Sequence, residues 1–405
     1  IWIKPPMRLN DPVWQSVPQI GKILSALKGK ARFVGGCVRD TLAGREPADI
    51  DMATPLKPAA VMGILKKRGF TVLPTGFLYG TVTVLTGDDR FPTIEMTTLR
   101  RDIENDGRRP KVVYTKDWEE DAARRDFTFN ALYADFDGTV YDYCDGVRDL
   151  NDGRVRFIGD PAQRIGEDCL RILCYFRFLA RFDAEPDAAT MDACRSGGGG
   201  LARLSLDRTR RELFKLVETD NAARGLSAMN DTGLLETYFP AQGLPVLNRF
   251  LHLFPAACLP FRLAALYGVT PEGVEAATQR WQLSKTQRKP MMLAASFDRS
   301  KPHESYTDND VFRFAVRFRK TGTDEVLSLF ASVDGNDGWL SLGEKCRGVE
   351  IPPFRFSGGD LTELVKKNQI KAALEQVHEH WLAENGRIGR AGLLDFARER
   401  FTPRR

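Results

Sequence analysis

A glycine pair between a short apolar run and a helical pattern constrains this chain more than any other feature. Arg32–Val34 predicts a β-strand, Gly35-Gly36 predicts a tight turn, and a helix should follow from about Val38 to Ala43. Glycine lets the backbone approach a phosphate closely, and the N–H groups at the start of a helix favour an anion. The turn is therefore a candidate nucleotide-binding element, to which Arg39 adds a positive charge.

Two aspartates follow on the next predicted strand. Asp49 and Asp51 alternate along it, so both carboxylates should project from one face. Glu95, on a later predicted strand, faces the same way and could supply a third carboxylate. Neighbouring carboxylates repel strongly unless a cation lies between them. Three such oxygen ligands suit Mg²⁺, and they can hold two ions that activate an attacking hydroxyl and stabilise a leaving pyrophosphate. We therefore predict a catalytic magnesium site at Asp49, Asp51 and Glu95.

The first ~140 residues alternate short strands with helices, which predicts a mixed α/β head. Thr54-Pro55 predicts the N-cap and first residue of a helix that runs to about Arg68. Tyr79 to Leu85 and Thr93 to Leu99 alternate as strands. The polar segment from Arg100 to Trp118 predicts a long loop.

After Pro161 the pattern becomes helical to the end of the chain. Asp160-Pro161 should start a helix that reaches about Ala180, and Gly197 to Gly200 predicts a joint before helix resumes at Leu204. A chain of 405 residues is too long for one core. The expected fold class is α+β, a mixed-sheet head followed by an all-helical neck, body and tail. The expected boundaries are 1–145 for the head, 146–217 for the neck, 218–350 for the body and 351–405 for the tail.

Four motifs occur in a fixed order along the first half of the chain. They are Gly35–Asp40 with Asp49–Asp51, Ile94–Arg100, Arg124–Ala131 and Glu167–Arg171. Together they resemble the class II tRNA nucleotidyltransferases (CCA-adding enzymes) and the bacterial poly(A) polymerases, within the polymerase-β-like nucleotidyltransferase superfamily. The resemblance implies addition of C, C and A to the 3′ end of tRNA from CTP and ATP, with release of pyrophosphate.

The resemblance also assigns nucleotide-binding roles in the motif Arg124–Ala131. It implies that Arg125 contacts the triphosphate and that Asp126 and Asn130 lie near the sugar. A 2′-hydroxyl there gives and accepts hydrogen bonds, which distinguishes ribose from deoxyribose. Alternatively, the Arg-Asp pair joins the head to the neck, and the two roles are compatible.

The last motif supplies a candidate base filter. Asp168 and Arg171 should lie at i and i+3 on one helix face. Cytosine and adenine each offer an amino donor beside a ring-nitrogen acceptor, which an Asp and an Arg can match, whereas uracil and guanine present the reverse order. The resemblance assigns base selection to Glu167, Asp168 and Arg171. The alternative is a surface ion pair between Glu167 and Arg171.

Further along the same helix the chain departs from the family pattern. Arg177 matches the third arginine of the family's series, which binds nucleotide, but Cys174 stands where a second arginine is usual. The substitution puts substrate affinity in doubt and leaves the reaction class intact. We expect Cys174 to be a packing residue rather than a reactive thiol.

Rival functions share the same head. Bacterial poly(A) polymerases usually carry a basic signature soon after the aspartate pair, whereas the matching stretch here, Pro74–Val82, looks like the CCA-adding side. The segment Arg100–Trp118 corresponds to a loop that takes part in the switch from C to A addition, which favours the full C-C-A programme over CC-adding or A-adding enzymes. A non-catalytic RNA-binding protein is disfavoured by the three intact carboxylates.

Composition adds weak limits on partners and compartment. The net charge of +5 leans towards a polyanionic partner such as tRNA, although such a surplus also serves solubility. Seven cysteines without CxxC spacing favour a reducing cytoplasm. No stretch approaches the ~20 apolar residues that span a bilayer. We expect a cytoplasmic monomer or weak dimer with no membrane contact.

Overall fold

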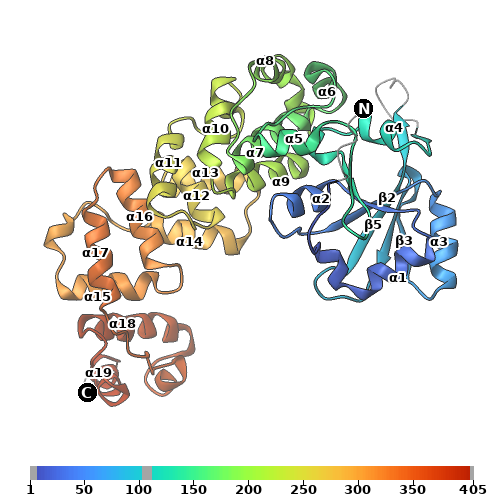
Figure 1. Ribbon diagram of the computed structural model, residues 1–405. Helices are drawn as coiled ribbons and strands as arrows, with labels where there is room; N and C mark the ends of the chain where they lie inside the picture. The colour runs from blue at the N-terminus through green and yellow to red at the C-terminus, as the bar shows by residue number, and fades with distance from the viewer. Residues whose placement is uncertain (1–6, 103–111, 402–405) are drawn as a thin grey trace. The chain divides into compact units, whose positions relative to one another are not determined.

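The computed structural model describes residues 7–102 and 112–401 (Figure 1). The chain divides into two compact units. The first contains the residues up to 216 together with 231–234, and the second contains 217–230 and the residues from 235 onward. The finer division into head, neck, body and tail stays a prediction.

A seven-stranded mixed sheet forms the centre of the first unit (Figure 1). Its strands are β1 (Arg32–Val34), β2 (Ile50–Thr54), β3 (Val72–Gly76), β4 (Thr81–Leu85), β5 (Thr93–Thr98), β8 (Leu132–Ala134) and β9 (Val140–Asp142). Their order is β3-β4-β5-β2-β1-β8-β9. β2 and β5 run parallel, and all other neighbours are antiparallel. The predicted mixed sheet and α+β class are confirmed.

Strand alternation separates an apolar face of this sheet from a polar one. Met52 and Met96 are buried in the main core of the head, beneath helices α1 (Pro18–Ala26) and α3 (Pro58–Lys67). Residues at the intervening positions, such as Asp51 and Glu95, therefore face the other way. Burial of one face thus fixes the register that exposes the carboxylates.

The predicted start of α3 at Thr54-Pro55 is wrong. Thr54 ends β2, and its hydroxyl donates a hydrogen bond to the carbonyl of Lys30 and accepts one from the Leu56 amide. The first residue of the helix is Pro58, one turn later. Both prolines suit the first position of a helix, so the local pattern did not separate them.

The segment predicted as one long loop is partly regular. β6 (Arg100–Asp102) pairs antiparallel with β7 (Val112–Tyr114), and α4 (Trp118–Ala123) follows directly. The Asp117 carboxylate caps α4 by accepting a hydrogen bond of 2.9 Å from the Glu119 amide. Residues 103–111 of the predicted loop lie outside the described residues.

The predicted single helix from Pro161 to about Ala180 is two helices. α6 (Pro161–Glu167) ends where Asp168 becomes extended, with φ −153° and ψ 104°, and α7 (Leu170–Phe182) begins two residues later. Asp168 Oδ1 accepts a hydrogen bond from the Leu170 amide. Asp side chains compete with helix hydrogen bonds in this way. Asp168 and Arg171 therefore do not share a continuous helix face.

The four-glycine segment is a packing contact rather than a joint. α8 (Ala188–Gly197) runs directly into a 3₁₀ helix at 198–203. A β-carbon on Gly197 would lie 2.4 Å from Cγ2 of Ile165, and one on Gly200 would lie 2.1 Å from Sγ of Cys169. These glycines let α8 and the 3₁₀ turn approach the α6–α7 segment closely.

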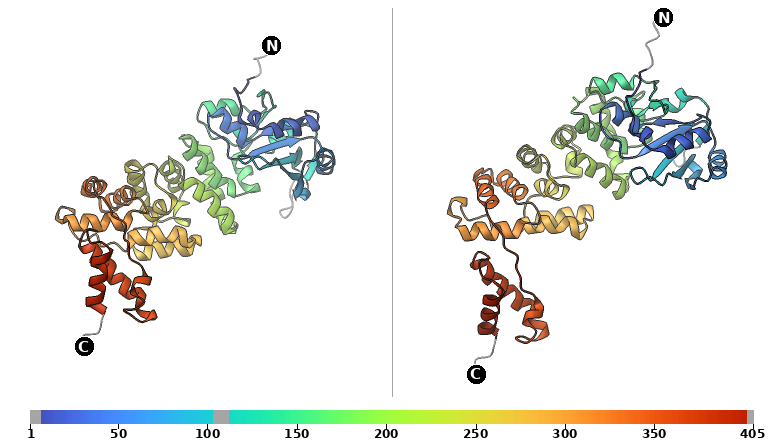
Figure 2. Two further views of the ribbon diagram at one scale, coloured as in Figure 1. Left: turned by 90° about the horizontal axis from the view of Figure 1, so that it is seen from below. Right: turned by 60° about the horizontal axis from the view of Figure 1, so that its bottom comes forward.

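Helices make up the rest of the described chain (Figure 2). The remaining bounds are α2 (Gly36–Leu42), α5 (Gly146–Asn151), α9 (Leu206–Val217), α10 (Ala222–Asp231), α11 (Gly243–Leu253), α12 (Leu259–Tyr267), α13 (Pro271–Trp281), α14 (Lys285–Ala295), α15 (Asp308–Phe318), α16 (Thr323–Asp334), α17 (Gly338–Arg347), α18 (Ile370–Ala383) and α19 (Arg390–Phe401). Buried Leu361 and Trp381 belong to a core that α18 and α19 share with Phe312 of α15. Within the described ranges, none of the helices combines the length and apolarity that crossing a membrane requires.

The glycine contact gives a direct stability test. Gly197→Ala should destabilise the protein by about 1–3 kcal/mol, because the β-branched side chain of Ile165 cannot move away freely. Gly199→Ala is the matched control, since nothing lies within 4 Å of its β-carbon position. Chemical denaturation of both variants measures the difference. Equal stability of the two would contradict a packing role for Gly197.

Candidate active site

Two carboxylates lie side by side on the polar face of the sheet. The parallel register of β2 and β5 sets Asp51 beside Glu95, and Glu95 in turn faces Thr83 on β4. Asp49 lies in the bend directly before β2. Burial, then the negative charges of Asp49 and Glu95, raise the pKa of Asp51 to about 6 against the opposing effect of Arg125. The fold therefore concentrates negative charge at this point.

This carboxylate row has the right donor chemistry for a divalent cation. Its oxygens are the hard ligands that Mg²⁺ prefers. Burial first, and then the negative charges of Asp49 and Glu95, raise the pKa of Asp51, and a cation would relieve the repulsion between the carboxylates. In the described parts of the chain, however, no three His, Cys, Asp or Glu side chains already converge on one possible metal position. The donors fit the ion, and their coordination remains a prediction.

The glycine turn brings backbone close to an arginine. Gly35 has φ +75° and ψ −126°, a conformation that is essentially restricted to glycine, and Gly36 begins α2. A β-carbon on Gly35 would lie 3.7 Å from Nη1 of Arg125 and 3.6 Å from the carbonyl oxygen of Asn130. The turn and Arg125 thus border the same space.

Arg125 is held by a buried carboxylate that sequence reasoning missed. Its Nη2 donates to Asp121 at 3.1 Å, its Nε donates to the Tyr133 hydroxyl at 3.2 Å, and that hydroxyl donates to Asp121 at 2.7 Å. Burial lowers the pKa of Arg125, but Tyr133 and Asp121 outweigh it and the net pKa is raised. Arg125 is therefore a fixed positive charge. The i, i+4 spacing of Asp121 and Arg125 was the available signal.

Arg39 lies beside the glycine turn and is held by protein partners. Its Nε and Nη2 donate to the two oxygens of buried Asp40 at 2.8 and 2.9 Å, and its Nη1 donates to Oδ1 of Asn130 at 2.6 Å. Asn130 Nδ2 donates in turn to Asp126 at 3.1 Å, and Arg181 of α7 lies 3.0 Å from Asp40. Beside the glycine turn, Arg39 thus links α7, through Asp40, to the predicted sugar-binding pair.

The three predicted base-selection residues lie in one segment of the chain but form two separate ion pairs. Asp168 lies 2.7 Å from Arg208 of α9. Arg171 pairs with Glu167 and donates to the carbonyl of Arg164 at 2.7 Å. The alternative interpretation, an ion pair between Glu167 and Arg171, is thus present. No direct Asp168–Arg171 side-chain bond occurs among the residues described.

Arg177 and Cys174 both face α9. Arg177 Nε donates to Glu212 at 2.7 Å, and the Cys174 thiol lies 3.6 Å from the same carboxylate. Burial first, and then Glu212, raise the pKa of Cys174 to about 12, so its thiol stays protonated near neutral pH. The pattern agrees with a packing role for Cys174. At position 174, where the family usually has its second arginine, this chain has an uncharged thiol.

Comparison with known proteins identifies the family. Residues 31–156 match the description "Poly A polymerase head domain", and residues 185–243 match "Probable RNA and SrmB- binding site of polymerase A". The chain is 32% identical to CCA tRNA nucleotidyltransferase 1, mitochondrial, of Mus musculus, over 97% of this chain and 93% of that protein. The chain belongs to the CCA tRNA nucleotidyltransferase family. The Homo sapiens protein of the same name gives the same identity and coverage.

A solved CCA-adding enzyme has the same fold along its whole length. The Bacillus stearothermophilus enzyme in complex with CTP is 26% identical, with a TM-score of 0.67, and the match covers 96% of this chain and 99% of that chain. The predicted family and enzyme class are confirmed. Since two of the relatives are named as mitochondrial, the expected cytoplasmic location stays a prediction.

Proposed function

We propose that this CCA tRNA nucleotidyltransferase adds C, C and A in turn to tRNA 3′ ends from CTP and ATP, without a nucleic-acid template. The observation that carries the proposal is the pairing of Asp51 with Glu95 across β2 and β5, with Asp49 beside them. Such a charged row is costly for the fold alone, so it supports a catalytic use.

Asp49, Asp51 and Glu95 are the residues that would hold Mg²⁺. When bound there, Mg²⁺ would favour deprotonation of the attacking 3′-hydroxyl and stabilise the charge on the leaving pyrophosphate. Arg125 binds the triphosphate through its fixed guanidinium. Because Asp121 and Tyr133 already hold that group in place, it needs no reorganisation as charge develops on the phosphate.

Asp126 and Asn130 read the sugar in this proposal. Asn130 is oriented from both sides, since its oxygen accepts from Arg39 and its nitrogen donates to Asp126. A fixed carboxylate can accept a hydrogen bond from a ribose 2′-hydroxyl, and a fixed amide can donate one to it. Deoxyribose lacks this hydroxyl. Arg177, held by Glu212, is a further candidate nucleotide ligand.

Asp168 and Arg171 select the base in this proposal. The amino group of cytosine or adenine would donate to Asp168, while Arg171 would donate to the adjacent ring nitrogen. Both side chains have protein partners without nucleotide, so base binding would compete with Arg208 and Glu167 for them. A mismatched base would leave a charge unpaired, at a cost of roughly 1–3 kcal/mol per contact.

The helical regions after residue 146 hold the tRNA in this proposal, the neck beside the nucleotide and the body and tail along the acceptor arm. Recognition by shape and phosphate contacts would let the enzyme accept tRNAs of different sequence. The family relationship supports tRNA, CTP and ATP as partners.

The products formed on defined tRNA ends test the proposal. A tRNA lacking CCA should gain two C residues with CTP alone and CCA with both nucleotides, whereas a tRNA that already ends in CCA should not be extended. Sequencing of the 3′ ends measures this, with Asp51→Ala as the inactive control. A run of several A residues would favour a poly(A) polymerase, and addition of only CC or only A would favour a partial enzyme.

Asp168→Ala tests the base filter. The variant should accept UTP and GTP at least 10-fold better relative to CTP than the wild type does, because one discriminating contact is lost. Competition assays with all four nucleotides measure the ratio. Arg208→Ala is the matched control, since it removes the ion pair of Asp168 but keeps the carboxylate. Unchanged rejection of UTP and GTP in Asp168→Ala would contradict the base-reading role.

A further inference from the structure

The second unit contains a large cavity that the proposed chemistry does not use. Its volume is about 1010 Å³, the upper end of the range of ligand pockets. Its walls come from α14, the end of α15, the segment 351–354 and α18. The cavity therefore lies within one compact unit, remote in sequence from the carboxylate row.

Five cations line this cavity and no carboxylate does. Lys285 and Lys289 come from α14, and Arg317, Arg319 and Lys320 come from the end of α15. In the described part of the chain, none of the five makes an ion pair with an Asp or Glu. An uncompensated positive cluster of this size attracts a polyanion.

Arg317 is anchored as part of this wall. Its Nη2 donates to the carbonyl of Leu293 at 3.2 Å and to the hydroxyl of Ser296 at 3.1 Å. Both partners are neutral and belong to the end of α14, so the bonds fix the guanidinium and leave its charge uncompensated. Burial lowers the pKa of Arg317. An anionic ligand would offset that burial.

The interior of the cavity is apolar and aromatic. Leu293, Val316 and Ile351 contribute aliphatic surface, and half-buried Phe354 lies edge-on to His378, with ring centroids 4.9 Å apart. Burial lowers the pKa of His378, which favours its neutral form. A flat apolar group inside the cavity would thus contact aromatic rings, with the cationic side chains around it.

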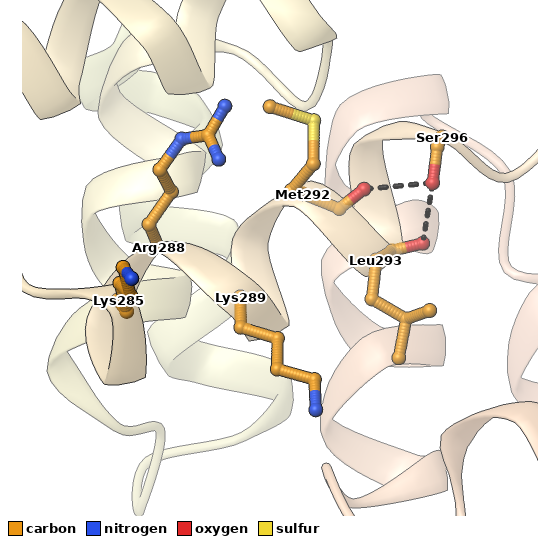
Figure 3. A pocket seen from close by; sticks show the side chains of 6 residues that line it. All are labelled: Lys285, Arg288, Lys289, Met292, Leu293 and Ser296. Carbon is orange, nitrogen blue, oxygen red and sulfur yellow. Dashed lines mark hydrogen bonds between the residues drawn. The ribbon is translucent and has the colours of Figure 1, made fainter.

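The cationic surface continues around α14. A second pocket of about 400 Å³ shares Lys285, Lys289 and Leu293 with the cavity and adds Arg288. Figure 3 shows Lys289 and Leu293 on one side of the helix, and Arg288 on the opposite side. Arg288 is paired with Glu275 at 3.1 Å. Within residues 7–102 and 112–401, the cations without an ion pair therefore lie on two walls of the cavity, Lys285 and Lys289 on α14 and Arg317, Arg319 and Lys320 at the end of α15.

We propose that this cavity binds one unstacked nucleotide of the tRNA substrate, with its base inside against Phe354 and its flanking phosphates on Lys285, Lys289 and Lys320. The assignment rests on the proposed function only in taking tRNA as the substrate. A free nucleoside triphosphate has the same chemistry but carries its phosphates at one end. A strand carries them on both sides of the base, which matches cations on two separate walls of the cavity, α14 and the end of α15.

Charge reversal in the full chain tests the phosphate contacts. Lys289→Glu with Lys320→Glu should raise the KM for a tRNA lacking CCA at least 10-fold and reduce the salt slope of tRNA binding by about one to two, because each phosphate contact contributes about 0.7–0.9. Lys345→Glu with Lys371→Glu is the matched control, since both lysines are exposed and outside the cavity. The KM for CTP at saturating tRNA should be the same in both double variants.

Phe354→Leu tests the base contact separately. Leucine keeps an apolar side chain but removes the flat ring and part of its volume, so tRNA affinity should fall about fivefold or more with an unchanged salt slope. Thermal unfolding of each variant checks that the unit is folded. A tRNA affinity of Phe354→Leu equal to that of the wild type would overturn the base contact, and a tRNA KM and salt slope of the Lys289→Glu, Lys320→Glu variant equal to those of its control would overturn the phosphate contacts.

Calorimetry with ATP or CTP alone distinguishes the two sources of the ligand. Loss of a second nucleotide site in Lys289→Glu with Lys320→Glu, together with unchanged tRNA binding, would overturn the assignment to an RNA strand. Mobility-shift binding of tRNA does not depend on catalysis. Failure of the wild type to extend tRNA would therefore count against the proposed function and leave this measurement intact.

Discussion

Repulsion between Asp51 and Glu95 is the constraint on which the rest of this site depends. The parallel register of β2 and β5 sets the two side by side, about 5 Å apart by strand spacing, and the apolar core on the opposite face prevents either from turning inward. Because Glu95 is exposed, solvent screens part of this repulsion, and two like charges so close cost on the order of 1 kcal/mol. The sheet thus carries an electrostatic cost that a divalent cation would remove.

Buried carboxylates fix three arginines of the first unit, including Arg125 beside the carboxylate row. Asp121, Asp40 and Glu212 are 1%, 6% and 9% exposed, and each holds an arginine by at least one hydrogen bond. A buried carboxylate left without its partner is strongly destabilising, so the arginines are fixed in direction as well as in charge. The fold therefore separates the carboxylate row of Asp49, Asp51 and Glu95 from buried carboxylates that orient positive charge.

Local periodicity predicted the sheet and the common face of Asp51 and Glu95, because alternation in a half-buried strand is set by nearby residues. It did not predict that the Asp168 side chain would interrupt the helix by bonding to the Leu170 amide. Nor did it separate Thr54-Pro55 from the true start of α3 at Pro58, or show that Gly197 packs on Ile165. Those outcomes depend on which partner a side chain finds, and composition and spacing do not specify long-range partners.

Magnesium-dependent stability as a function of pH tests the central claim most directly. The folded-state pKa of Asp51, about 6, lies above the ordinary value of 3.8, so the folded protein binds the extra proton and loses stability as pH rises through 6. Without metal, Asp51→Asn should therefore be more stable than the wild type at pH 8 by about 1–2 kcal/mol, but not at pH 3.5. Mg²⁺ should stabilise the wild type more at pH 8 than at pH 5 and should barely affect Asp51→Asn. Asp89→Asn, an exposed position in the head, is the control. Equal stabilisation of the wild type and Asp51→Asn by Mg²⁺ would contradict the account.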